Sequence, residues 1–165
     1  MTASNKLLAT MVVGFGLALA GCQKDEPTPP IAPGPAPASC GIDGARLQAT
    51  FDGAAFCANV SLFASDAAGT ITISGMSTQG STLTLEIDSM SVGTHAITEN
   101  TNAMLHTTTL AMSYTAMDAL PGTLTIESHD LVLKRIKGTF SASLQGAFGG
   151  PPKTIIGSFD VFYVD

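Results

Sequence analysis

The chain is predicted to contain an all-β domain, either an antiparallel β-sandwich or a flattened β-barrel of about eight to ten strands. Two observations predict this class. Apolar side chains alternate with threonine and serine at a period of two in several runs, and glycines separate the runs at short intervals. Such alternation is typical of antiparallel strands that have one face on a core and the other in water. Residues 103–117 are rich in Met and Ala and resemble a helix, but Thr107, Thr108 and Thr109 favour a strand because they are β-branched.

Three runs carry the alternation most clearly. In residues 70–74, 82–87 and 123–127, leucine or isoleucine occupies one face and mainly hydroxyl-bearing residues the other. Residues 46–51 and 54–64 flank Asp52-Gly53, a dipeptide typical of hairpin turns. The other expected strands are residues 94–98, 103–114, 131–144 and 154–164.

The chain divides into three segments, of which the first, residues 1–21, is a predicted lipoprotein signal peptide. Lys6 supplies the positive charge, residues 7–19 are mainly apolar, and Leu19-Ala20-Gly21 precedes Cys22. This arrangement resembles a bacterial lipobox, in which the cysteine is acylated and becomes the first residue of the mature chain. The apolar run is shorter than the roughly 20 residues that a bilayer span needs. The alternative is an ordinary signal peptide near a free cysteine.

The second segment, residues 22–39, is a predicted linker. After Cys22 it begins with Gln23-Lys24-Asp25-Glu26. No aspartate directly follows Cys22, so the inner-membrane retention signal of many lipoproteins is missing, and the run resembles a surface-export tag. The alternative is a solvated charged stretch. The proline-rich residues 27–39 favour an extended polyproline conformation, which reaches roughly 40 Å at about 3.1 Å per residue. The linker would therefore hold the third segment, a single all-β domain of residues 40–165, away from the lipid.

Composition narrows the possible partners. The chain has a formal net charge of −6, which disfavours nucleic acid because phosphate binding needs a cationic face. The basic cluster Lys134, Arg135 and Lys137 is interpreted as a solvated strand face. No Trp is present, so an aromatic platform for sugars is disfavoured.

Cys40 and Cys57 remain once Cys22 is assigned to the lipid anchor. An even pair in an oxidising compartment predicts a disulfide. The alternative is two separate thiols, with Cys57 buried as a small apolar residue. The chain has no closely spaced cysteine pair of the kind found in zinc sites.

The sequence offers no convincing catalytic motif, so we expect no enzyme activity, cofactor or metal. His95, His106 and His129 are predicted to be separate surface or half-buried residues. Glu86 and Asp88 fall on one strand face, and we interpret them as a solvated outer face rather than an acid–base pair or calcium site.

The order of several β segments resembles that of small Bacteroidetes lipoproteins with a C-terminal domain of unknown function. The segments are Phe51-Asp52-Gly53-Ala54-Ala55-Phe56-Cys57-Ala58, Ile71-Thr72-Ile73-Ser74-Gly75, Gly93-Thr94-His95, Gly122-Thr123-Leu124-Thr125-Ile126, Lys137-Gly138-Thr139-Phe140 and Gly157-Ser158-Phe159. The resemblance covers residues 45–163 and implies fold and location only, since that family has no established activity. Cys57 and His95 stand at positions that are often filled otherwise.

Together these observations predict a lipid-anchored lipoprotein of the outer membrane or cell surface, acting as a non-catalytic structural or interaction module. Its expected partners are the membrane, through the anchor on Cys22, and an unidentified protein or small molecule. The alternative is a lipoprotein whose β-barrel binds a small ligand in an apolar interior.

Overall fold

The computed structural model describes residues 40–165, so the predicted signal peptide and linker lie outside the described residues. The described part is an all-β domain of eleven strands, which confirms the predicted class. It contains no helix long and apolar enough to cross a membrane. The strands are β1 (Arg46–Phe51), β2 (Ala54–Cys57), β3 (Ser61–Ala67), β4 (Thr70–Met76), β5 (Thr82–Ile87), β6 (Gly93–Ile97), β7 (Met104–Thr107), β8 (Ser113–Ala116), β9 (Gly122–Asp130), β10 (Arg135–Gly146) and β11 (Lys153–Phe162).

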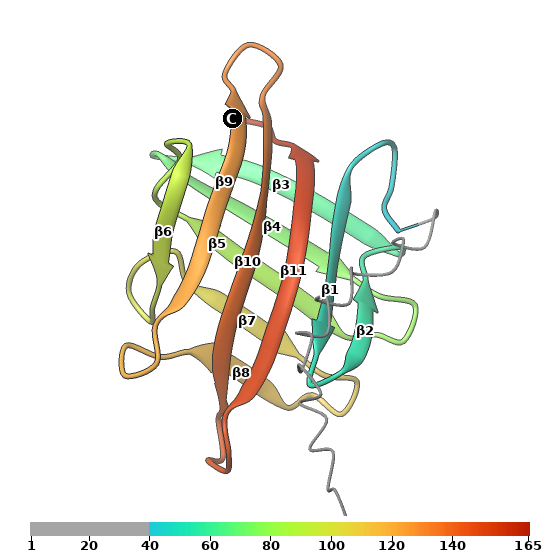
Figure 1. Ribbon diagram of the computed structural model, residues 1–165. Coiled ribbons are helices and arrows are strands. Elements are labelled where there is room, and N and C mark those ends of the chain that lie inside the picture. The colour runs from blue at the N-terminus through green and yellow to red at the C-terminus, as the bar shows by residue number, and fades with distance from the viewer. Residues whose placement is uncertain (1–39) are drawn as a thin grey trace, which may run out of the picture. The chain divides into compact units, whose positions relative to one another are not determined.

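The strands form one antiparallel sheet that curls into a half-barrel. The order is β2-β1-β11-β10-β8-β7-β5-β4-β3, and β9 and β6 branch from β10. The long strand β10 makes this branch possible, because its first part pairs with β9 and its last three residues pair with β8. The layer containing β6, β9, β10, β11 and β1 therefore faces a layer of β3, β4, β5, β7 and β8 (Figure 1).

The C-terminal residues, which follow β11 in the first layer, form hydrogen bonds with β3 at the edge of the second layer. Beyond β11, the Val164 carbonyl oxygen accepts a hydrogen bond of 2.7 Å from the Asp66 amide. The Val164 amide in turn donates to the Ala64 carbonyl oxygen at 3.1 Å. These two bonds satisfy backbone groups on β3 that would otherwise be unpaired at a sheet edge.

Apolar side chains from both layers fill the space between them. The strands alternate buried and exposed residues, as the period-two sequence pattern predicts. Burial of this apolar surface is the main favourable term in folding. The largest side chains with almost no exposed area are Phe159, Leu47, Ile71, Ile73, Leu83, Leu85, Ile87, Ile97, Leu124, Ile126, Ile136 and Leu144.

Two reciprocal Gly–Phe pairs join β10 to β11 at the centre of the first layer. Gly138 lies opposite Phe159, and Phe140 lies opposite Gly157. The two rings stack with an interplanar angle of 15° and centroids 6.5 Å apart. A Cβ at Gly138 would lie 2.8 Å from Phe159 Cζ, and a Cβ at Gly157 would overlap the Phe140 ring. The glycines are therefore needed because each phenyl ring covers the backbone of the opposite strand.

The Asp52-Gly53 turn between β1 and β2 is confirmed, and both residues have positive φ, as a two-residue type I′ turn requires. Three predicted strands were wrong in extent. Residues 54–64 form β2 and β3 with a break between them, and residues 103–114 form β7, a turn and β8. Residues 131–134 are the turn between β9 and β10 rather than the start of a strand. These segments have high β propensity, so their sequence does not indicate a turn. The turns depend instead on side-chain contacts and on positive φ at Ala111 and Lys134.

Candidate functional site

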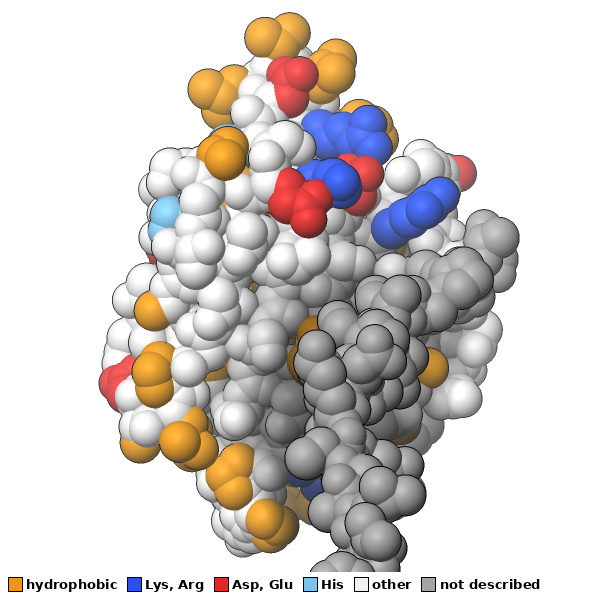
Figure 2. Space-filling view, viewed as in Figure 1, with side chains coloured by type: hydrophobic (Ala, Val, Ile, Leu, Met, Phe, Trp, Pro, Cys, Tyr) orange, Lys and Arg blue, Asp and Glu red, His pale blue; other side chains and the backbone are white. Residues whose placement is uncertain are grey.

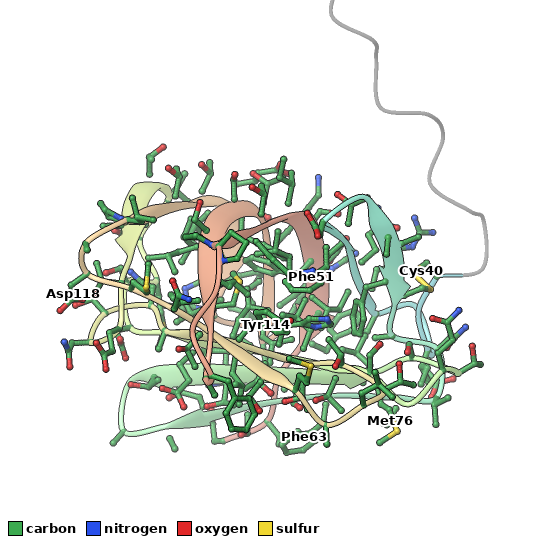
Figure 3. The ribbon with its side chains drawn as sticks, turned by 90° about the horizontal axis from the view of Figure 1, so that it is seen from below. Cys40, Phe51, Phe63, Met76, Tyr114 and Asp118 are labelled. Atoms are coloured by element: carbon green, nitrogen blue, oxygen red, sulfur yellow. A yellow bond between two sulfur atoms is a disulfide. The ribbon has the colours of Figure 1, made fainter. Side chains whose placement is uncertain are left out.

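The domain begins at a disulfide between Cys40 and Cys57, which confirms the predicted pairing. The two Cα atoms lie 5.4 Å apart, within the usual range for a bridge. The bond ties the first described residue to the end of β2. It therefore fixes the place where the preceding chain enters the domain (Figure 3).

The structure separates the three histidines into different environments. His95 on β6 is half-buried, and its Nε2 atom lies 2.7 Å from the Ser91 carbonyl oxygen. His129 on β9 is half-buried, and its Nε2 atom lies 2.8 Å from the Tyr163 hydroxyl. His106 on β7 is buried in the interior. Within residues 40–165, no three His, Cys, Asp or Glu side chains gather in a way that could hold a metal ion.

His106 packs among aromatic rings between the two layers. Its ring centroid lies 4.3 Å from that of Phe51 and 5.9 Å from that of Phe56, and Tyr114 is the next aromatic neighbour of Phe51 (Figure 3). The side chain is only 4% exposed, and its Nδ1 atom has no hydrogen-bond partner among the described residues. Burial lowers the pKa of His106 below its ordinary value, because the protonated ring would lose its hydration.

Glu86 and Asp88 lie in different surroundings. Glu86 is exposed on the outer face of β5, as predicted. Asp88 accepts hydrogen bonds from the Thr70 hydroxyl at 2.8 Å and from the Asn102 amide at 3.0 Å. Asn102, which is 2% exposed, accepts from the Asp88 and Ser89 amides at 3.0 Å each. Asp88 therefore holds the loop before β7 in place.

Two shallow hollows open on the surface. One holds about 200 Å³ and is lined in part by Glu86, Glu99 and Leu105. The other holds about 130 Å³ and lies between the β1–β2 hairpin and β7, where Phe51 and His106 contribute to its wall. Both volumes are below the roughly 300 Å³ at which typical ligand pockets begin.

An apolar tip on the turn between β9 and β10 is the most prominent surface feature. Leu131, Val132 and Leu133 are 68%, 90% and 61% exposed. The turn projects beyond the rest of the domain (Figure 1), and its apolar side chains stand at the top of the space-filling view (Figure 2). Sequence reasoning missed this tip, although three consecutive apolar residues break the alternation of the neighbouring strands.

The predicted basic face lies directly below the tip, and its cations are ion-paired. Arg135 contacts Asp160 through two hydrogen bonds of 2.6 and 2.8 Å, and Lys134 contacts Asp165 at 2.9 Å. Lys137 contacts Glu127 at 2.8 Å. These hydrogen bonds to carboxylates raise the pKa of Lys134, Arg135 and Lys137. The cluster is solvated, as predicted, and it is locally neutralised by carboxylates.

Comparisons with known proteins identify a family but no activity. No curated protein and no solved structure matches the chain. A family model described as a domain of unknown function, DUF6252, matches residues 43–150, which is more than half of the chain. The match runs from just before β1 into the turn after β10, and β11 lies beyond it. The chain therefore belongs to the family of the DUF6252 domain of unknown function.

Proposed function

We propose that this protein is a lipid-anchored lipoprotein of the outer membrane or cell surface, and that its β domain is a non-catalytic structural or interaction module. The observation that carries the proposal is the Cys40–Cys57 disulfide at the entrance to the domain. Disulfides form and persist in oxidising compartments outside the cytoplasm. That environment agrees with the Leu-Ala-Gly-Cys signal ending at Cys22 and with the resemblance to surface lipoproteins of Bacteroidetes.

The hydrogen bonds that the polar side chains make within the domain support a non-catalytic role. Acid–base or nucleophilic catalysis needs at least two such groups within hydrogen-bond reach of each other and of a substrate. Here His129 is engaged by the Tyr163 hydroxyl, and Asp88 is engaged by loop amides. His106, the histidine without a partner on Nδ1, is shielded by apolar rings.

The filled interior disfavours the alternative of a barrel that binds a small ligand. Large side chains such as Phe159, Leu47 and Ile73 have at most 1% of their area exposed and occupy the space between the layers. Interiors packed in this way leave few voids larger than a water molecule. A partner would therefore contact the outer surface.

The anchor is tested by replacing Cys22 with alanine in the full-length chain. We expect the wild type to fractionate with membranes as a mature chain that begins at Cys22 and carries acyl mass. The C22A variant should lose both the added mass and most of the membrane association, because two or three acyl chains are needed for stable anchoring. Gln23→Ala, which changes the next residue and leaves the lipobox intact, is the matched control. Membrane association of C22A equal to that of the wild type would refute the anchor.

The expected absence of a metal site has its own test. We expect the purified protein to contain no stoichiometric metal by elemental analysis. Stoichiometric metal that is lost after replacement of His95 or His129 by alanine would instead indicate a metal site. Both residues are suited to this test because neither belongs to the buried core.

A further inference from the structure

We propose that the apolar tip, Leu131, Val132 and Leu133, inserts into the interface of the same bilayer that holds the lipid anchor. The inference rests on the proposed lipid anchoring and adds a second contact with the membrane. Three neighbouring aliphatic side chains at 61–90% exposure cost free energy in water. A shallow apolar insertion would remove this area from water.

Backbone groups of the tip form hydrogen bonds within the domain, as an apolar environment requires. The Asp130 carboxylate accepts hydrogen bonds of 2.8 Å from the amides of both Val132 and Leu133. The Lys134 carbonyl oxygen accepts one of 2.8 Å from the Tyr163 amide. Because backbone groups that enter lipid must be satisfied internally, this turn can enter the bilayer interface at lower cost than an open loop.

The shape of the tip favours lipid over a protein partner. A stable protein interface buries about 800 Å² on each side, which requires roughly 20 residues in a broad surface. The tip is instead a narrow projection with three apolar residues at its end (Figure 1). A fluid bilayer adapts to such a projection, whereas a protein would need a matching pocket.

The surroundings of the tip suit the level of the lipid headgroups. Phe162 and Val164, at the base of the hairpin, are about half exposed. The Arg135 guanidinium lies 5.0 Å from the centre of the Phe162 ring and is paired with Asp160. Since each cation of the basic cluster has a carboxylate partner, insertion should not require anionic lipid.

The attachment point of the tether is compatible with this contact. Cys57, to which Cys40 is bonded, is in register with Gln48, and Ser158, the partner of Gln48 on β11, is in register with Thr139 in the first half of β10. The chain therefore enters the domain in the half of the first layer that carries the tip. Seventeen residues separate Cys22 from Cys40, and such a segment spans about 50 Å when extended. That length allows the tip to reach the anchoring bilayer.

The test places a fluorescent label on the tip of the acylated full-length chain in phosphatidylcholine vesicles. Val132→Cys gives one reactive thiol, because Cys22 carries lipid and Cys40 is bonded to Cys57. We expect quenching by spin-labelled lipid and at least about tenfold protection from an aqueous quencher, since burying one aliphatic side chain is worth about a factor of ten in partitioning. Phe148→Cys is the matched control, because Phe148 is 88% exposed in the turn at the opposite end of β10.

A second variant tests whether the apolar side chains cause the insertion. Adding Leu131→Ser and Leu133→Ser to the labelled Val132→Cys chain should abolish the protection. In the Val132→Cys chain without the serine substitutions, a label that the aqueous quencher reaches as fast as the label at position 148 overturns the tip proposal, while flotation with the vesicles shows that the anchor stands. Failure to float refutes the anchor itself.

Two further outcomes would also overturn the proposal. Protection from the aqueous quencher without quenching by lipid indicates that the tip contacts a protein or a second copy of the chain. Protection that occurs only when phosphatidylglycerol is added indicates attraction of the basic cluster to anionic lipid.

Discussion

The reciprocal Gly–Phe pairs predict that Gly157→Ala destabilises the domain. A Cβ at position 157 would overlap both the Gln48 carbonyl oxygen and the Phe140 ring, and it would lie 2.8 Å from the Ala49 Cβ. The carbonyl belongs to the backbone of β1, which pairs with β11 on the side away from β10. The added methyl group is therefore confined on both sides, and the neighbouring strand cannot move without breaking its ladder.

The expected size of the effect follows from two opposing contributions. Alanine in place of glycine inside a strand ordinarily stabilises by roughly 0.5–1 kcal/mol through the unfolded chain. Overpacking by one methyl group costs about 1–3 kcal/mol, and the rigid backbone contact places this site at the upper end. We expect a net loss of about 2 kcal/mol, which lowers the Tm of a domain of this size by about 8 °C.

Urea unfolding followed by circular dichroism measures the free energy of unfolding directly. Ser158→Ala, on the outer face of the same strand, is the control and should change stability by less than about 1 kcal/mol. Phe140→Leu combined with Gly157→Ala should show a favourable coupling energy of at least about 0.5 kcal/mol, because the smaller side chain removes one of the two overlaps. A Gly157→Ala domain as stable as the wild type, or strictly additive double-variant energies, would refute this account of the pair.

Three other predictions concern the disulfide, the buried histidine and the loop before β7. Reduction of Cys40–Cys57, which closes a loop with a sequence separation of 17, should lower the free energy of unfolding by about 3 kcal/mol in urea titrations with and without reductant. Burial lowers the pKa of His106, so the unfolded chain binds a proton on this ring more tightly than the folded domain does. The contribution of the neutral His106 to stability is therefore complete above pH 6.5 and is lost as the pH falls below 6.5 toward the lower folded-state pKa. His106→Phe should therefore reduce the slope of stability against pH below 6.5 by up to about 1.4 kcal/mol per pH unit. Asn102→Ala should cost about 3 kcal/mol by chemical denaturation, because it leaves two loop amides without their acceptor in a partly buried site.

Each of these predictions has a clear contrary result. Equal unfolding midpoints with and without reductant would show that the bridge does not constrain the unfolded chain. Parallel pH profiles for the wild type and His106→Phe would mean that His106 titrates normally in the fold. Asn100→Ala, which removes an exposed amide that contacts Asp118, should cost less than about 1 kcal/mol. An equal loss at positions 100 and 102 would show that burial of the Asn102 amide is not the cause.

The strands that sequence reasoning found are those in which period-two alternation is uninterrupted. Residues 46–51 and 82–87 were predicted with the bounds that β1 and β5 have. In both, leucine or phenylalanine faces the core and polar residues face outward, so local pattern and tertiary packing agree. The Asp52-Gly53 turn was recognised for the same reason, since its residues favour the positive φ that the turn needs.

The turns that were missed lack such local signals. The turn between β7 and β8 has its positive φ at Ala111, a residue that ordinarily avoids that conformation. The turn between β9 and β10 consists of Leu131, Val132 and Leu133 followed by Lys134, and all four residues favour strands or helices. Its conformation depends on the Asp130 carboxylate, which binds two amides ahead of it. The candidate membrane contact was missed because the same apolar residues were assigned to a strand.

The match to the DUF6252 family covers less than the unit that folds. The matched residues 43–150 exclude Cys40, which closes the disulfide, and all of β11. Yet β11 lies between β1 and β10, with six residue pairs on one side and ten on the other. It also contributes Ile155, Phe159 and Val161 to the core. A chain that ended at residue 150 would leave β1 and β10 each without a partner on one side, and Gly138 would lose the Phe159 ring that covers it. The last fifteen residues therefore belong to the same cooperative domain.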